Sequence, residues 1–193
     1  MKALTVRDIL TKDAYEAARP ETRRRVMVLK DKRRVAVGGN CTVHFECRDT
    51  MIYQVHEMLR AEGSWSRPGA VEDEIEAYAP IVPAAGELSA TIMFEYETPE
   101  ERAVVLPRLV GIDRRVFLEI GGTEPLLALF DRGQIDERQV SSVQYVKWKL
   151  DERHRALLRD DGTVVRIRIT HPCYAAEAVL SEATRRAIMN DPD

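Results

Sequence analysis

Residues 41–63, CTVHFECRDTMIYQVHEMLRAEG, change their hydrophobic period halfway along the stretch. Up to Cys47, apolar and polar residues alternate, which is the pattern of a strand with one buried face. From Thr50 onward, apolar residues recur at helical spacing, as in an amphipathic helix. Because the strand runs into the helix without a linker, we expect a sheet that carries helices, and hence an α+β fold.

The rest of the chain alternates between these two patterns. Tight turns join neighbouring strands, which favours antiparallel pairing. The strand at 87–96 is expected in the centre of the sheet, because both of its faces are largely free of charge. Further strands are expected at 33–39, 114–122, 124–131, 143–150, 163–172 and 174–180, and further helices at 71–82, 98–109, 151–162 and 181–190.

Three helical stretches are expected before the first strand, and Thr5 with Asp8 marks the start of the first. Thr11 begins the second, which should stop before Pro20, since the residue before a proline avoids the helical conformation. Pro20 then suits the first turn of a third helix through residues 21–34. Residues 1–33 are therefore expected to form an N-terminal helical segment, and residues 34–193 an α+β core.

The fold expected for residues 1–193 is a single α+β domain with a mostly antiparallel sheet and helices packed mainly on one face. A chain of 193 residues buries about 70% of the surface that it exposes when unfolded, which suffices for a stable core. No internal repeat, low-complexity segment or long linker divides the sequence.

Charge and composition exclude several classes of protein. The 29 Lys and Arg against 32 Asp and Glu give a net charge of -3, which argues against a nucleic-acid binder. No apolar run approaches the roughly 18 residues of a membrane helix, and the N-terminus does not resemble a signal peptide. Cys41, Cys47 and Cys173 form no Cys-x-x-Cys pair, so we expect reduced thiols and a cytoplasmic location.

The helix after Cys47 is expected to have one apolar and one polar face. Its apolar stripe should dock on the sheet. The polar face gathers side chains of the types that transfer protons or bind carboxylates and phosphates. On a helix, Asp49, Tyr53, His56 and Arg60 fall within about 60° of one another, with Glu57 just beyond. The stripe consists of Met51, Ile52, Val55, Met58 and Leu59, and the candidate ligand or partner site of Arg48, Asp49, Tyr53, His56, Glu57 and Arg60.

Two interpretations of that polar face remain open. It can be an ordinary solvated or salt-bridged helix surface, with Asp49 or Thr50 as the N-cap. It can also be a site for an anion, which backbone N–H groups at the start of the helix would favour. Arg48 and Asp49 are expected to be buried with partners, because the strand leaves little room for either to reach water.

A basic run precedes the first strand and offers a second candidate surface. Solvated helix faces account for most such runs, and the alternative is a docking patch for an acidic partner protein. The candidate patch consists of Arg23, Arg24, Arg25, Lys30, Lys32, Arg33 and Arg34.

No metal site or cofactor is expected. The chain has His44, His56, His154 and His171 but no HExxH motif and no Cys-x-x-Cys pair. His44 and His171 lie on expected strands, where only the tertiary fold would bring them near His56. No P-loop, GxSxG or GxGxxG motif occurs either.

Several stretches of the sequence resemble one family. They are RRVAVG, TVHFECRDTMIYQVHEMLRAE, EIEAYAPIVPAAGELSATIMFE, VQYVKWKL and ITHPCYAAEAVLS. Together they are similar to the bacterial domain-of-unknown-function family numbered 3501, over nearly the whole chain. Members commonly have Asn where this chain has Cys47. The resemblance implies no known activity.

The resemblance does imply a setting. Genes of this family tend to lie beside genes for rubrerythrin-like and iron–sulfur proteins, which implies a redox or oxidative-stress module. This chain has too few cysteines to hold a cluster itself. We therefore expect a non-catalytic accessory protein that binds such redox partners. The alternative is an enzyme or small-ligand binder that acts on an anionic substrate at the junction from Arg48 to Arg60.

Overall fold

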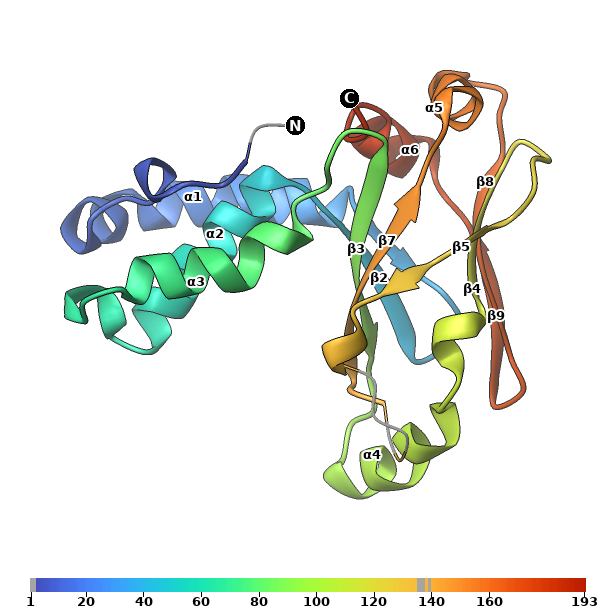
Figure 1. Ribbon diagram of the computed structural model, residues 1–193, viewed down its shortest axis with the longest axis horizontal. Helices are drawn as coiled ribbons and strands as arrows, with labels where there is room; N and C mark the ends of the chain where they lie inside the picture. The colour runs from blue at the N-terminus through green and yellow to red at the C-terminus, as the bar shows by residue number, and fades with distance from the viewer. Residues whose placement is uncertain (1–2, 135–137, 139) are drawn as a thin grey trace.

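Two antiparallel sheets pack face to face in the computed structural model, which describes residues 3–134, 138 and 140–193 (Figure 1). The first sheet has five strands in the order β1 (Arg34–Ala36), β2 (Cys41–Glu46), β3 (Glu87–Phe94), β7 (Val143–Lys149) and β6 (Leu129–Phe130). The second has four strands in the order β5 (Leu126–Leu127), β4 (Val116–Ile120), β8 (Val165–His171) and β9 (Tyr174–Val179).

The main core lies between the two sheets. Alternate residues of each strand point inward, so Phe45 of β2 and Ile92 of β3 share one cluster with Leu118 of β4 and Ile167 of β8. Trp148 of β7 is fully buried, with its ring 6.0 Å from that of Phe45. The strand periodicity therefore supplies both inner faces of a β-sandwich.

Helices cover the other face of the five-stranded sheet and the ends of the sandwich. α1 (Lys12–Asp31), α2 (Arg48–Ala61) and α3 (Ala70–Tyr78) form a layer on the side away from the second sheet (Figure 1). α4 (Pro99–Val105) lies at one end, and α5 (Glu152–Arg159) and α6 (Glu182–Ile188) lie at the other. Short 3-10 turns are found at Val6–Asp8, Ser64–Ser66, Ala79–Ile81, Leu106–Leu109, Ile112–Arg114 and Arg132–Gln134.

The α+β class is confirmed, and β3 lies in the centre of the five-stranded sheet as expected. The division of the strands between two sheets is a finding of the structure. The residues expected as one strand at 124–131 in fact form β5 and β6, which belong to different sheets. Ala128 is buried between them and donates its N–H to the carbonyl of Val116, so the chain crosses from one sheet to the other there.

Two expectations for the helices were wrong. α1 continues through Pro20 as one helix, because Tyr15 before the proline and Val26 after it are both buried on the same side of the protein. The stripe of α2 docks mainly on other helical elements rather than on the sheet. Met51, Val55 and Leu59 pack in a second cluster with the N-terminal segment and α3, in which Tyr145 is the sheet residue.

The junction between β2 and α2 is tightly bonded. Cys47 precedes the helix in an extended conformation, and its N–H donates to the Thr50 hydroxyl at 3.0 Å. That hydroxyl also lies 2.6 Å from a carboxylate oxygen of Glu46, the last residue of β2. The absence of a linker therefore fixes Glu46 at the point where sheet and helical layer meet.

Three further observations concern the chain as a whole. The three cysteines are free, with Cys41 and Cys47 buried and Cys173 exposed. Among the residues that the structure describes, none of the helices has the length and apolarity that a bilayer span requires. The same residues contain no group of three or more His, Cys, Asp and Glu side chains that is suited to hold a metal.

Candidate functional site: a cavity on the outer face of the five-stranded sheet

The floor of the candidate site is a polar row across four strands. The register pairs Arg34 of β1 with His44 of β2, His44 with Thr91 of β3, and Thr91 with Tyr145 of β7. All four residues lie on the face opposite the sandwich core, since their neighbours in each strand point inward. A guanidinium, an imidazole, a hydroxyl and a phenol therefore lie side by side on this face, with Arg34 exposed on the edge strand.

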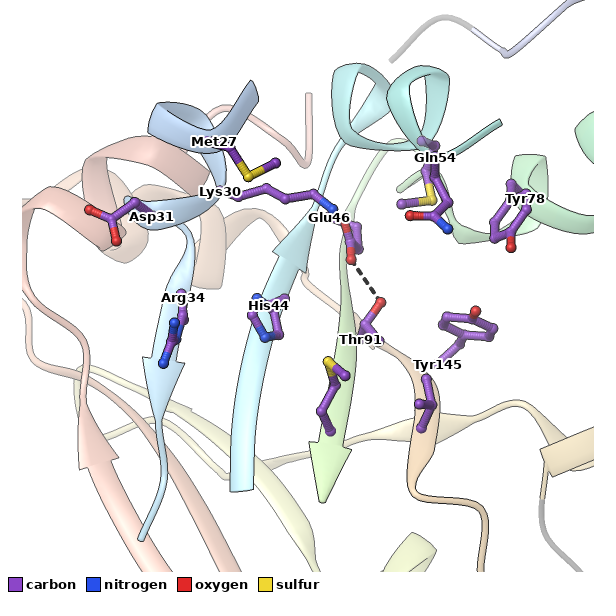
Figure 2. A pocket seen from close by; sticks show the side chains of 13 residues that line it. Met27, Lys30, Asp31, Arg34, His44, Glu46, Gln54, Tyr78, Thr91 and Tyr145 are labelled. Carbon is purple, nitrogen blue, oxygen red and sulfur yellow. Dashed lines mark hydrogen bonds between the residues drawn. The ribbon is translucent and has the colours of Figure 1, made fainter. Parts of the chain in front are cut away.

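The helical layer forms the roof over this row. α1 contributes Met27 and Lys30, α2 contributes Met51 and Gln54, and α3 contributes Tyr78. Figure 2 shows Lys30 and Gln54 above the strands, Arg34 at one end of the cavity and the rings of Tyr78 and Tyr145 at the other. The cavity encloses about 600 Å³, within the range of about 300–1,000 Å³ that is usual for small-molecule sites.

The walls of the cavity are largely apolar. The thioethers of Met27, Met51 and Met93 line it together with Val143. Methionine side chains are flexible and polarizable, so they adapt to ligands of irregular shape. A ligand with an apolar body would fit between them and the two tyrosine rings.

Glu46 is the buried acid of the cavity. Only 5% of the surface of Glu46 is exposed to solvent. The Thr91 hydroxyl donates to one carboxylate oxygen at 2.7 Å, drawn in Figure 2, and the Thr50 hydroxyl donates to the other at 2.6 Å. Both donors are neutral hydroxyls, so they provide hydrogen bonds to the Glu46 carboxylate but no positive charge opposite it.

His44 lies between Arg34 and Thr91 on the floor. Burial, which disfavours the charged imidazolium, is the main cause that lowers the pKa of His44; the Glu46 carboxylate opposes this shift, and the nearby Arg34 and Lys30 add to it. The ring is therefore neutral at pH 7 and presents both a donor and an acceptor nitrogen to the cavity.

The cavity also holds two cations. Lys30 and Arg34 both line it, and neither forms an ion pair with any residue in the described part of the chain. Arg34 lies at one end, near Asp31, whereas the Lys30 side chain extends from α1 toward Glu46 (Figure 2), so the cavity contains one positive charge from the sheet and one from the helical layer.

The polar face of α2 that was singled out from the sequence lies on a different side of the helix and is covered by α1. Tyr53 and His56 are buried, whereas Asp49 and Arg60 are exposed. Asp49 and His56 also line a hollow of about 220 Å³ between α1 and α2, smaller than the usual ligand site. The cavity that opens on α2 is lined instead by Met51 and Gln54.

Each charged residue of that face has a partner in the N-terminal segment. Arg48 is half-buried and pairs with Asp8, so its expected burial is confirmed. Asp49 is exposed, with Arg25 at 3.7 Å, so its expected burial is wrong. The preceding strand fixes the backbone position of Asp49, but α1 does not cover its side chain, which stays in contact with solvent. Arg60 pairs with Glu16 at 2.9 Å.

Glu57 is the centre of this interface. Its carboxylate accepts hydrogen bonds from the Tyr15 hydroxyl at 2.5 Å and from two nitrogens of Arg19 at 2.8 and 2.9 Å. The hydrogen bond from Arg19 is the largest cause that lowers the pKa of Glu57 to about 2. The face is thus a helix–helix contact built of side-chain pairs, and whether it also binds a ligand or partner stays a prediction.

His56 holds the N-terminal segment in place as a neutral ring. Its Nε2 accepts the N–H of Leu10 at 2.8 Å, so Nδ1 carries the proton and donates to the carbonyl of Ile52 at 2.7 Å. The ring stacks on Tyr15 with centroids 4.3 Å apart. Burial is the main cause that lowers the pKa of His56.

We expect this arrangement to make stability depend on pH near neutrality. Because the pKa of His56 is lowered in the folded state from 6.5, the unfolded chain binds more protons below pH 6.5, and stability falls as pH falls through 6.5 toward the folded pKa. The pKa of His44 is lowered too and acts in the same direction.

Urea denaturation between pH 5 and 8 measures this dependence. His56→Gln should flatten the fall in unfolding free energy below pH 6.5, and the double variant with His44→Gln should flatten it further. Glu57 does not confuse the result, because its stabilising effect is lost only as pH falls from about 4.5 toward about 2. If the unfolding free energy of His56→Gln depended on pH as it does in the wild type, protonation of His56 would not destabilise the folded state.

The basic run does not form one continuous patch. Arg33 is buried in a bidentate pair with Asp191, and Lys30 and Arg34 line the cavity. Arg24 pairs with Glu21 on the surface, and Arg25 lies near Asp49. Arg23 and Lys32 are exposed. A docking role for the exposed members stays a prediction.

The histidines of the chain do not converge. His171 lies in β8, with its Nε2 3.1 Å from the carbonyl oxygen of Val110. Asp151 caps the start of α5: its carboxylate accepts the N–H of His154 at 2.8 Å and lies 2.6 Å from Nδ1 of the His154 ring. His44 alone among the four lines the large cavity.

Comparisons with known proteins identify the family. The model of a family described as protein of unknown function (DUF3501) matches residues 3–192. The chain belongs to the DUF3501 family. This match confirms the resemblance found in the sequence. No curated protein matches the chain.

A crystal structure of a similar protein has the same fold. A protein of unknown function from Burkholderia pseudomallei K96243 is 32% identical to this chain, with a TM-score of 0.91, and the alignment covers 100% of both chains. The sandwich and its helical layer are therefore shared with an experimentally determined structure.

The sequence carried part of the signal for the cavity. Thr42, His44 and Glu46 alternate with the apolar residues of their strand, so their common face was visible. Thr91 and Tyr145 come from strands more than forty residues away, and only the register brings them beside His44. Glu46 was missed because one acid on a strand normally faces solvent.

Proposed function

We propose that this protein binds a small organic acid with an apolar body in the cavity between the helical layer and the five-stranded sheet. The observation that carries the proposal is the presence of Lys30 and Arg34, without ion-pair partners among the described residues, in a cavity walled by methionines and tyrosines. The acid group lies at these cations and the apolar part lies over the floor.

Several physical considerations support this assignment. Arg34 offers a planar, bidentate donor set that matches a carboxylate, and Lys30 adds a second charge from above. The neutral ring of His44 offers a further donor beside Arg34. The roof and the floor come from different layers, so a ligand bound between them contacts both at once.

The proposal also modifies the earlier alternative. An anionic substrate was expected at the junction from Arg48 to Arg60, on the polar face of α2. The proposed site lies at the same strand–helix junction but uses Glu46 and the Met51 and Gln54 side of the helix. The N-terminal segment occupies the other side.

Val143→Trp tests the proposal by filling the cavity. The probes are hydrocinnamate and isocaproate, and the measurement is the shift of the melting temperature of the purified full chain. A probe at 100 times its Kd stabilises the fold by about 2.7 kcal/mol, or roughly 5–10 °C. We expect such a shift in the wild type and its loss in Val143→Trp.

Val179→Trp is the matched control. Val179 lies on β9 and is exposed on the outer face of the second sheet, outside the cavity. This variant should keep the full shift. No shift of the wild type with either probe, or a shift that survives in Val143→Trp, would contradict the proposal.

A further inference from the structure

Glu46 is a buried carboxylate without a cation. Its hydrogen-bond donors are the hydroxyls of Thr50 and Thr91. It forms no ion pair with any of the residues that the structure describes. A buried charge is costly unless an opposite charge or several donors offset the lost hydration.

The neighbouring cations do not neutralise Glu46. Arg33 is engaged by Asp191 and by the carbonyl of Ala187. Lys30 reaches from α1 toward Glu46 in Figure 2 but forms no ion pair with it. Its ammonium lies 5.7 Å from the centroid of the Tyr53 ring. Glu46 thus faces the cavity with no cation at ion-pair distance among the described residues.

We infer that the ligand carries an amino group as well as an acid group, so that its ammonium pairs with Glu46 while its acid group pairs with Arg34 and Lys30. This inference rests on the proposed function and narrows it to amino-acid-like zwitterions with an apolar side chain. Glu46 is the residue that determines this specificity.

The register supports the distance between the two charged subsites. Arg34 is paired with His44, and Glu46 follows His44 by two positions on the same face of β2. Strands lie about 4.8 Å apart and rise about 3.3 Å per residue, so the Cα atoms of Arg34 and Glu46 are about 8 Å apart. This separation leaves room between the two side chains for a ligand that carries both an acid and an amine.

The selectivity has a physical cause. An acid without the amine leaves the Glu46 carboxylate unpaired after the ligand has displaced water from the cavity. A zwitterion replaces that water with an ammonium, which donates up to three hydrogen bonds. The methionines and the rings of Tyr78 and Tyr145 then contact the apolar side chain.

Matched probe pairs test the inference by isothermal titration. L-phenylalanine differs from hydrocinnamate, and L-leucine from isocaproate, only by the amino group. In the wild type, we expect the amino acid of at least one pair to bind about tenfold or more tightly than its partner acid. Glu46→Gln should reduce this ratio to about one, because it removes both the partner of the ammonium and the carboxylate that the acid leaves unpaired.

Glu87→Gln is the control. Glu87 is also an acid on the outer face of the same sheet, but it pairs with Lys147 at 2.7 Å and does not line the cavity. This variant should keep the wild-type ratio. Circular dichroism confirms that each variant is folded.

The outcomes separate the two levels of the proposal. If the acids bind and the amino acids bind no better, or if Glu46→Gln keeps the preference, the inference about the amine is overturned and the proposed function stands. If neither acid binds the wild type, the proposed function is overturned together with the inference that rests on it.

Discussion

Arg33→Ala is expected to lower the free energy of unfolding by about 3–5 kcal/mol, because it leaves the carboxylate of Asp191 buried without its cation. Arg33 and Asp191 are 6% exposed each. The guanidinium donates to both carboxylate oxygens, at 2.6 and 2.9 Å, and also to the carbonyl of Ala187. The pair joins the end of α1 to the C-terminal residues.

Chemical denaturation with urea measures this effect. Arg24→Ala is the control, because Arg24 is exposed and pairs only with Glu21 one turn earlier. That variant should lose about 0.5 kcal/mol or less. The double variant of Arg33→Ala with Asp191→Ala should recover part of the loss, since no charge is left buried. Equal stabilities of Arg33→Ala and Arg24→Ala would show that Asp191 is hydrated in solution.

Tyr15→Ala is the second change with a large expected effect. Tyr15 is 0% exposed, stacks on His56 and lies 5.8 Å from the ring of Trp65 between centroids. Removing a buried aromatic ring costs about 3–5 kcal/mol, through lost burial and the cavity that it leaves. Urea denaturation should measure this loss of unfolding free energy. Hydrogen exchange should show that the variant loses amide protection in α1 more than in the strands.

Tyr15→Phe separates packing from hydrogen bonding. It keeps the ring but removes the hydroxyl that donates to Glu57, which still has both hydrogen bonds from Arg19. We expect a loss of about 1 kcal/mol. If Tyr15→Ala and Tyr15→Phe were equally destabilising, the ring would contribute nothing to the docking of α1 on α2.

The class of fold was predictable because strand and helix periods differ. Alternation in β2 and β3 and helical spacing in α2 identified these elements correctly. The pairing of strands into two sheets was not predictable, since an inward-facing row of residues looks the same whether a sheet or a helix covers it. Pro20 was misleading because tertiary packing overrides local propensity. Residues before and after the proline are both buried, and this packing keeps α1 continuous.

The candidate site was predictable only in part. Helix spacing showed correctly that Tyr53, His56 and Arg60 share a face, but spacing does not say what covers that face. α1 covers it, with Tyr15 and Arg19 as partners that no local pattern indicated. The cavity depends on strand register between residues far apart in sequence, which periodicity does not determine.

The association with rubrerythrin-like and iron–sulfur proteins, which the family resemblance implies, stays a prediction. The exposed members of the basic run, Arg23 and Lys32 among them, remain the surface for it. Co-purification from the native organism, compared between the wild type and a variant with both residues changed to Glu, tests it directly. A redox partner retained equally by both would exclude this surface.

The order of the strands has a consequence for how the chain folds. Strands β1 to β3 belong to one sheet, β4 and β5 to the other, β6 and β7 return to the first, and β8 and β9 return to the second. No continuous fragment therefore holds one complete sheet without strands of the other. The helical layer, by contrast, is formed almost entirely by residues before β3. We expect the early contacts to be helical and the closure of the sandwich to limit the folding rate, since its pairings join distant segments. On a ribosome, the helices would emerge and pack long before β7 completes the floor beneath them.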